Sequence, residues 1–355
     1  MYSNRHVLDK NRLALLELVR AGLWEKEARI SQCGKLVFPV ISTMAEAQGV
    51  IGLIASGLKR VDIKPSQIDV LNIIGSALQV EQRNKSMDAF IADIVEKMRV
   101  DGIYTLLVKG QGVAQCYEKP LWRSSGDIDF LLSEDNYKKA RAFLLPLSSS
   151  NKGEERYSQH LGMSIGEWYV EIHGSLRTGL SGQIDIVVDA VQNDVFNGGN
   201  VRSWYNGKTQ VFLPAPTNDV FLVFTHFIKH YYKEGMTLRQ LCDWCRLIWT
   251  YKDTLNYGLL ESWIKKSGLM SEWKGFATVA VEYLGMSVEV MPFYEEKDNQ
   301  NHNRAERIMA FILNGSHGKV RDTFEISKIF PWHTIKFLPS IFLNVNGLKI
   351  KERLF

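Results

Sequence analysis

Hydrophobic positions recur at two different spacings along the chain, and the changes of spacing divide the sequence into three parts. Over residues 1–100 the apolar residues recur with helical spacing, which predicts a helical N-terminal segment. Residues 101–213 hold short runs in which apolar and polar residues alternate, a pattern typical of strands. Helical spacing returns over residues 214–355. We therefore expect an α+β fold, in which a small mixed β-sheet is flanked by N-terminal and C-terminal helical domains.

Prolines and capping residues set limits to the expected elements. Pro214 and Pro216 mark the boundary between the second and third parts, because each lacks an amide donor and has a fixed φ. Ser86, Ser133 and Thr217 are each expected to cap a helix that follows them. The expected strands of the central part are residues 104–110, 126–132, 157–165, 167–173, 183–188 and 209–213.

Composition and charge exclude several classes of protein. The chain of 355 residues has 43 basic and 39 acidic ones, so its net charge of +4 gives no strong nucleic-acid signature. No apolar run approaches the roughly 20 residues that a membrane helix needs, so we expect no membrane partner. Four cysteines in a chain of this length give no disulfide framework. Together with an N-terminus that lacks an apolar signal region, they favour a cytoplasmic setting.

The most informative motif is the pair Asp127 and Asp129 at the start of an apolar run. Alternation on a strand places both carboxylates on one face, while Ile128 and Phe130 point into a core. Two adjacent carboxylates repel each other, and a divalent cation removes that repulsion. Because Mg²⁺ prefers carboxylate oxygens together with substrate phosphates, the pair indicates half of a phosphoryl-transfer site. The alternative is a solvated strand start with two ordinary surface acids.

Further polar residues lie near this motif and on a later strand. Lys109 and Gly110 end the expected strand that precedes the motif, and Arg123 lies just before the two aspartates. Glu171 and His173 lie two positions apart on a later expected strand, so they share one face. The order along the chain is strand, glycine turn, short helix, strand with two acids, helix, and strand with a third acid.

This order, with the motif K-G-x(3)-A-x(2)-Y … R-x(3)-D-I-D … V-E-I-H, resembles an uncharacterised bacterial nucleotidyltransferase family of the DNA polymerase β-like superfamily. The motif positions here are Lys109, Gly110, Tyr117, Arg123, Asp127, Asp129, Glu171 and His173. The resemblance implies that residues 101–213 form a nucleotidyltransferase core. It implies transfer of an NMP group from an NTP to a hydroxyl-bearing acceptor, with release of pyrophosphate. The acceptor stays open: a protein side chain, a small molecule, a sugar or an RNA end.

The resemblance assigns Asp127, Asp129 and Glu171 as catalytic residues and as ligands to Mg²⁺ or Mn²⁺. Glu171 is either the third ligand or a general base. Asp185 and Asp189, in a second alternating run, are rival candidates for the third carboxylate, and Asp185 is kept as the alternative. Glu171 could instead be a strand-face acid paired with Arg177. A different class of function is a catalytically inactive nucleotide-binding or toxin–antitoxin-like interaction protein on the same fold.

In the superfamily, a Gly-Ser or Gly-Gly turn holds the β- and γ-phosphates, and this chain has Lys109, Gly110 and Gln111 in its place. The serine hydroxyl is missing, and Lys109 supplies a cation that could neutralise the triphosphate instead. Gly110, Gln111 and Arg123 complete the expected nucleotide-binding set. The alternatives are that Lys109 is the solvated end of a strand and that Arg123 is an ordinary loop arginine.

The resemblance extends to a pattern H-x(3)-H … R-x(3)-D-W in the helical region. The matching residues are His226, His230, Arg239 and Asp243. With His173, they are expected to form a wall that faces the nucleotide or the acceptor. Packing in the core is the alternative for the histidines. A further alternative combines the two helical histidines with Cys242 and Cys245 in a zinc site.

Overall fold

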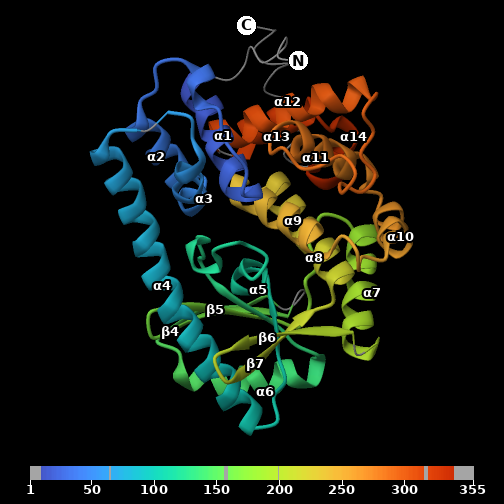
Figure 1. Ribbon diagram of the computed structural model, residues 1–355. Helices are drawn as coiled ribbons and strands as arrows, with labels where there is room; N and C mark the ends of the chain where they lie inside the picture. Colours follow the sequence, from blue (N-terminus) through green and yellow to red (C-terminus); the bar gives the residue numbers. More distant parts are fainter. Residues whose placement is uncertain (1–8, 64, 156–158, 199, 316–318, 340–355) are drawn as a thin grey trace, which may run out of the picture.

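A computed structural model of the protein describes residues 9–63, 65–155, 159–198, 200–315 and 319–339. Within these ranges the strands lie in the central part of the chain, with helical parts on either side (Figure 1). The α+β class with a mixed sheet and flanking helices is therefore confirmed. No helix in the described ranges is both long and apolar enough to cross a membrane.

The elements follow one another in three groups. The N-terminal helices are α1 (Lys10–Trp24), η1 (Ile30–Cys33), α2 (Phe38–Ala47), α3 (Ile51–Gly57), η2 (Leu58–Arg60) and α4 (Gln67–Val100). The central elements are β1 (Leu106–Val108), α5 (Gly110–Ala114), η3 (Pro120–Trp122), β2 (Ile128–Leu131), α6 (Glu134–Leu144), η4 (Leu145–Leu147), β3 (Ser150–Glu155), β4 (His160–Ile165), β5 (Trp168–His173), α7 (Gly182–Gly198), β6 (Val201–Asn206) and β7 (Thr209–Pro214). The C-terminal helices are α8 (Pro216–Lys233), α9 (Leu238–Tyr251), α10 (Tyr257–Ser267), α11 (Met270–Glu282), α12 (Asn299–Asn314), α13 (Lys319–Ser327) and α14 (Pro331–Phe337).

The strands form one sheet with the order β3-β4-β5-β2-β1-β7-β6. β2 pairs in parallel with β5 and β1 pairs in parallel with β7, whereas the other neighbouring strands are antiparallel. β4 and β5 form a hairpin that turns at Gly166 and Glu167. Because β2 and β5 are neighbours, the acids singled out in the sequence lie on adjacent strands.

The two faces of the sheet have different surroundings. One face packs against the C-terminal half of α4 and against α6, in a core that includes Met87, Ile91, Phe130, Tyr137 and Ile172. Figure 1 shows these two helices along the side and the bottom of the sheet, with α8 and α9 above it. On the other face, α7 packs on β1 and β2 through a small apolar cluster. The polar residues of interest lie on this second face.

The N-terminal and C-terminal helices share one hydrophobic core, although they are far apart in the sequence. Leu15 of α1 and Ile54 of α3 belong to the same buried cluster as residues of α8, α9, α11 and α12. Arg20 Nε donates a hydrogen bond to the backbone oxygen of Tyr283, 263 residues further along the chain, at 2.7 Å. The indole of Trp24 donates one to the backbone oxygen of Leu284. The three-part division of the chain stays a prediction about domain boundaries, but its first and third parts are packed together.

The run at residues 183–188 is helical, which corrects the expectation of a strand there. It belongs to α7, whose buried apolar residues recur every three to four positions: Ile184, Val187, Val188, Val191 and Val195. A window of six residues is too short to separate this period from alternation. Asp185 therefore lies on a helix and not on the sheet.

Two expected helix caps are wrong, and a third forms differently. Ser86 lies inside α4, a single helix of 34 residues that is capped by Ser66. Thr217 lies in the first turn of α8 and not before it. Ser133 precedes α6 as expected, but its hydroxyl accepts a hydrogen bond from the side chain of Asn136 and from no backbone amide of the helix. The helices exist as expected, but their boundaries depend on tertiary packing.

Candidate active site

The parallel pairing of β2 with β5 places Asp129 directly beside Glu171. Ile128 and Phe130 point to the opposite face of the sheet, where they are buried under α4 and α6. Asp127 lies just before β2, and carboxylate oxygens of Asp127, Asp129 and Glu171 all lie within 4.8 Å of one another. The expected cluster of three acids therefore exists, and its role in holding a metal ion stays a prediction.

The three carboxylates have different surroundings. Asp129 is buried, Glu171 is half-buried and Asp127 is exposed. Burial alone would raise the pKa of Asp129, but the ammonium of Lys109 and the hydrogen bond with His173 hold that pKa below its ordinary value. The neighbouring Asp129 carboxylate and partial burial raise the pKa of Asp127. The repulsion expected from the sequence is therefore present, and a cation between the carboxylates would relieve it.

Lys109 forms an ion pair within the acid cluster. Its Nζ lies 2.9 Å from Oδ1 of Asp129, and the lysine side chain is largely buried. The chain turns sharply between β1 and α5, with φ of 59° at Lys109 and 40° at Gly110. A positive φ is unfavourable for a residue with a Cβ, so the turn is strained at Lys109. The ion pair offsets one of the three negative charges, and a role of Lys109 toward a triphosphate stays a prediction.

The side chain of Gln111 is buried and hydrogen-bonded within the protein. Its Nε2 donates to Oδ1 of Asp88 at 2.5 Å, and its Oε1 accepts from the hydroxyl of Ser125 at 2.6 Å. Burial raises the pKa of Asp88 to about 6. The side-chain amide of Gln111 is therefore already engaged within the protein, and a place of Gln111 in the nucleotide site stays a prediction.

Arg123 is paired with Asp243 of α9. Nε of Arg123 donates to Oδ1 of Asp243 at 2.8 Å and Nη2 donates to Oδ2 at 2.7 Å, while Nη1 donates to the hydroxyl of Ser125 at 3.0 Å. The hydroxyl of Tyr117 also donates to Asp243, at 2.7 Å. Each guanidinium nitrogen donates a hydrogen bond within the protein, and the bonds among the described residues leave one N–H of Nη2 for the expected contact of Arg123 with a phosphate. In the structure Arg123 links the loop before β2 to α9.

Two histidines lie next to the acids on the same face of the sheet. His160 of β4 pairs with His173 of β5, and their rings stack with centroids 4.7 Å apart. Nε2 of His173 lies 2.8 Å from Oδ1 of Asp129, and Nε2 of His160 lies 3.2 Å from Oε2 of Glu171. The Glu171 carboxylate raises the pKa of His160, whereas burial lowers the pKa of His173. The histidines therefore extend the acid cluster toward β4.

The acids open into a cavity of about 660 Å³ that α8 and α9 line from the other side. His226 and His230 of α8 lie in this wall with their Nε2 atoms 3.0 Å apart. Arg239 of α9 donates a hydrogen bond to the backbone oxygen of Ser124 at 2.9 Å and, within the described ranges, forms no ion pair with a carboxylate. The structure thus brings the residues of the expected wall to one cavity, and their contact with a nucleotide or an acceptor stays a prediction.

Comparison with known proteins gives an independent line of evidence. The model of a protein family described as "Uncharacterised nucleotidyltransferase" matches residues 39–285, which is more than half of the chain. The chain belongs to this family. No curated protein and no solved structure gives a significant match. The resemblance seen in the motif is therefore confirmed, together with the expectation of a transferase enzyme.

In this nucleotidyltransferase the alternative third carboxylate lies away from β2. Asp185 accepts hydrogen bonds from the backbone amide and the hydroxyl of Thr178, at 2.8 and 2.9 Å, and so holds the turn before α7. Arg177, considered above as a partner of Glu171, forms an ion pair with Asp189 at 2.6 Å. The geometry favours Glu171 over Asp185 as the third carboxylate.

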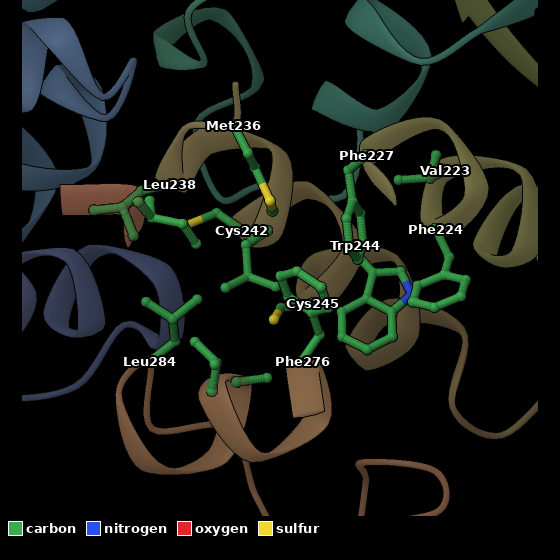
Figure 2. Close-up of a cluster of buried hydrophobic side chains, with 14 of the residues drawn as sticks. Val223, Phe224, Phe227, Met236, Leu238, Cys242, Trp244, Cys245, Phe276 and Leu284 are labelled. Atoms are coloured by element: carbon green, nitrogen blue, oxygen red, sulfur yellow. The ribbon is translucent and has the colours of Figure 1, made fainter. Parts of the chain in front are cut away.

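The structure of the nucleotidyltransferase does not support the zinc alternative in the helical region. Figure 2 shows Cys242 and Cys245 of α9 among apolar side chains such as Phe227 and Phe276. Burial raises the pKa of both thiols. The groups of described residues that could hold a metal ion include no cysteine. The C-x2-C pair is part of the hydrophobic core.

Three polar residues of this region are absent from the set expected from the sequence. His160 was not distinguished within its expected strand, and nothing pointed to Asp88 or Ser125, which hold Gln111. His160 had a detectable signal, because the two-residue turn at 166–167 sets it opposite His173. No comparable local signal exists for the other two.

Proposed function

We propose that this enzyme transfers a nucleoside monophosphate from an NTP to a hydroxyl-bearing acceptor and releases pyrophosphate, with Asp127, Asp129 and Glu171 as its catalytic carboxylates. The observation that carries the proposal is the parallel register of β2 and β5, which sets Asp129 beside Glu171. Asp127 joins them, with ligand oxygens of all three within 4.8 Å. Membership of a nucleotidyltransferase family supports the reaction class.

The donor set fits Mg²⁺ or Mn²⁺. All three groups are carboxylates, and hard divalent cations favour oxygen ligands. Three negative charges outnumber the one ammonium, that of Lys109, that pairs with them among the described residues, so the cluster favours a cation. When bound, such an ion would offset charge on the transferred phosphoryl group and lower the pKa of the acceptor hydroxyl.

Arg239 is the cation that we assign to the triphosphate. A triphosphate carries roughly four negative charges near neutrality, more than one divalent ion offsets. Lys109 and Arg123 are already paired with Asp129 and Asp243, whereas Arg239 has no carboxylate partner within the described ranges. Burial and the nearby Arg123 lower the pKa of Arg239, so an anion beside it would be favoured. The cavity of about 660 Å³ is large enough for such a ligand.

In the proposed reaction the acceptor oxygen attacks the α-phosphorus in line, and pyrophosphate leaves from the opposite side. The hydroxyl proton passes to a carboxylate of the site, for which Glu171 is the candidate. Burial acts to raise the pKa of Glu171, but His160 and His173 hold it below its ordinary value. Glu171 is therefore ionised near neutral pH and able to accept a proton.

Two measurements with the four α-labelled NTPs test this proposal. The first is release of pyrophosphate, and the second is transfer of the label to an acceptor supplied by a cell lysate. The wild-type protein with Mg²⁺ or Mn²⁺ should release pyrophosphate and label an acceptor, and Asp127→Asn/Asp129→Asn should do neither. Asp93→Asn, which removes an exposed carboxylate of α4, is the matched control and should behave as wild type.

Undiminished pyrophosphate release by the double variant would overturn the assignment of the carboxylates. Binding of NTP and a divalent ion by the wild type, without release or transfer for any nucleotide, would support a nucleotide-binding protein without turnover. Titration calorimetry with each NTP provides the binding measurement.

A further inference from the structure

A second group of metal-binding side chains lies beside the three acids and shares one of them. His160, Glu171 and His173 offer two imidazole nitrogens and a carboxylate oxygen, all within 4.8 Å of one another. We propose that these three side chains bind a divalent transition-metal ion such as Zn²⁺, at a site separate from the all-carboxylate site that includes Asp127 and Asp129. The proposal goes beyond nucleotidyl transfer and rests on the proposed function only through the shared Glu171.

The hairpin of β4 and β5 holds this group in place. His160 faces His173 across the two antiparallel strands, and Glu171 is the next residue on the same face of β5. The two imidazole rings stack in parallel planes with centroids 4.7 Å apart, so one ring has to turn about its side-chain bonds before both Nε2 lone pairs can point at one ion. Because the ligands come from paired strands, little chain order has to be gained when a metal ion binds.

The distances of the two imidazole nitrogens from the carboxylate oxygen of Glu171 fit tetrahedral coordination. Bonds of about 2.0–2.1 Å from zinc to histidine nitrogen and carboxylate oxygen place neighbouring ligand atoms about 3.3 Å apart. Oε2 of Glu171 lies 3.2 Å from Nε2 of His160 and 3.5 Å from Nε2 of His173. Three protein ligands also leave a fourth position for water or substrate, as in catalytic zinc sites.

Nε2 of His160 has no hydrogen-bond partner among the described residues. The atom is shielded from solvent, and its contact with Glu171 does not have the alignment of a hydrogen bond. Buried polar atoms without a partner are rare, and a metal ion at this position would supply one. Nδ1 of the same ring lies 3.8 Å from the carboxylate of Glu155. In metal sites an acid next to the second ring nitrogen commonly orients the imidazole that binds the metal.

The ligand chemistry separates the two sites. Two imidazoles with one carboxylate suit Zn²⁺, Co²⁺ or Fe²⁺, whereas carboxylates alone suit Mg²⁺ and Mn²⁺. The competing role for the histidines is to support the acids by hydrogen bonding, since Nε2 of His173 lies 2.8 Å from Oδ1 of Asp129. A metal bond to this nitrogen replaces that hydrogen bond. A measurement of metal binding therefore distinguishes metal ligands from residues that only support the acids. Loss of activity would not distinguish them, because it is expected in both cases.

Titration of the purified full-length protein with Co²⁺, followed by visible absorption, tests the proposal, because Co²⁺ occupies zinc-type sites and its spectrum reports nitrogen ligands. The wild type should bind Co²⁺ with a spectrum of tetrahedral type, and Zn²⁺ but not excess Mg²⁺ should displace it. His160→Gln removes the imidazole and keeps a polar side chain. It should weaken Co²⁺ binding by more than the roughly 10–100-fold that loss of an outer-shell group costs.

Asp127→Asn and His230→Gln are the matched controls. The first removes a carboxylate from the other site, the second removes an imidazole from the opposite wall, and both should keep the wild-type Co²⁺ spectrum and affinity. Glu171→Gln tests the same ligand set a second time, and thermal unfolding verifies that each variant is folded. Absence of Co²⁺ and Zn²⁺ binding, unchanged affinity in His160→Gln, or loss of binding in either control would overturn the proposal. His160-dependent Co²⁺ binding supports this site even where the nucleotidyl-transfer assay fails.

Discussion

Arg123 and Asp243 form a buried, doubly hydrogen-bonded ion pair, although 120 residues separate them in the sequence. The pair joins the loop before β2, which leads into the acids, to the helix that carries Arg239. Two parallel hydrogen bonds fix the relative orientation of the two groups as well as their distance. The position of Arg239 relative to the acids therefore depends on this pair.

Replacing Asp243 with alanine should destabilise the protein strongly, because it leaves the guanidinium of Arg123 buried without a counter-charge. Loss of one partner of a buried pair costs about 3–5 kcal/mol. Urea unfolding of Asp243→Ala measures the change, with Asp93→Ala on the exposed face of α4 as the control. A loss below about 1 kcal/mol would show that the pair contributes little.

Asp127→Asn and Asp129→Asn should differ in their effect on stability when no divalent ion is present. The Asp129 carboxylate repels that of Asp127 and so raises the pKa of Asp127. Asp127→Asn removes this repulsion and should leave stability equal or higher. Asp129→Asn takes the counter-charge from Lys109 and weakens the bond with His173, and should lower stability. Thermal unfolding with a chelator makes the comparison. Both variants should lose Mn²⁺-dependent NTP binding, and equal stability changes would contradict the assigned surroundings.

Glu171→Gln should depress turnover by roughly 10²–10⁴-fold while largely preserving nucleotide binding, because the amide cannot accept the acceptor proton. Single-turnover kinetics and calorimetry separate the two quantities. Asp185→Asn is the comparison, since Asp185 holds the turn at Thr178 and should affect stability only. Normal turnover in Glu171→Gln, together with loss of turnover in Asp185→Asn, would show that Asp185 and not Glu171 is the third catalytic carboxylate.

Arg239→Gln should weaken NTP binding by about 1.5–3 kcal/mol, the range for hydrogen bonds to charged groups. Binding of the nucleoside monophosphate should change much less, because the β- and γ-phosphates are absent. Arg239→Lys keeps the charge and should retain part of the affinity. Lys109→Met, measured in parallel by calorimetry, tests the expectation from the sequence that Lys109 neutralises the triphosphate. If Arg239→Gln weakens binding of the nucleoside monophosphate and the triphosphate equally, Arg239 does not contact the β- and γ-phosphates.

The stability gain from Asp88→Asn should depend on pH. Burial raises the pKa of Asp88 from 3.8 to about 6 in the folded protein, so the folded state binds its proton more tightly than the unfolded state. Ionising Asp88 therefore costs stability only at higher pH. The cost is absent below the pKa of Asp88 in the unfolded chain, grows between that pKa and the raised pKa of the folded protein, and is complete above the latter. Asparagine avoids this cost and still accepts the hydrogen bond from Gln111.

The gain for Asp88→Asn above pH 6 should reach roughly 1–2 kcal/mol, after allowance for the partial exposure of this carboxyl. Urea unfolding from acid to neutral pH gives the curve, and Asp93→Asn on the same helix is the matched control. A difference between variant and wild type that stays constant over this range would contradict the raised pKa.

The pair of aspartates in the acid cluster could be predicted because its determinants are local in the sequence. Alternation sets Asp127 and Asp129 close together, and Glu171 lies in a run that is plainly a strand. His160 was within reach of the same reasoning, because a two-residue turn fixes the register that sets it opposite His173. The pairing of β2 with β5 follows from the family resemblance and not from the local pattern.

Other features depended on contacts that local patterns do not encode. The sequence contains many arginines and acids, and nothing local selects Asp243 as the partner of Arg123. Whether residues 183–188 are a strand or a helix is decided by the longer period of α7 and by its packing. The hydrogen bonds that engage Gln111 join three segments of the chain, so its side chain could not be assigned before the structure was known.

The contact of α1 with the chain after α11 affects how the protein is made. Arg20 meets the backbone of Tyr283, 263 residues later, and ribosomes add about 5–20 residues per second, so the partner emerges roughly 13–50 s after the helix. Until then the contacts of Arg20 and Trp24 with residues 282–284 are missing, so this part of α1 stays exposed to chaperones and to aggregation. Stalled nascent chains should gain protease resistance in this region only after residue 284 has left the ribosome. We therefore expect the contact of α1 with residues 282–284 to form late in synthesis, after the described strands of the sheet have left the ribosome.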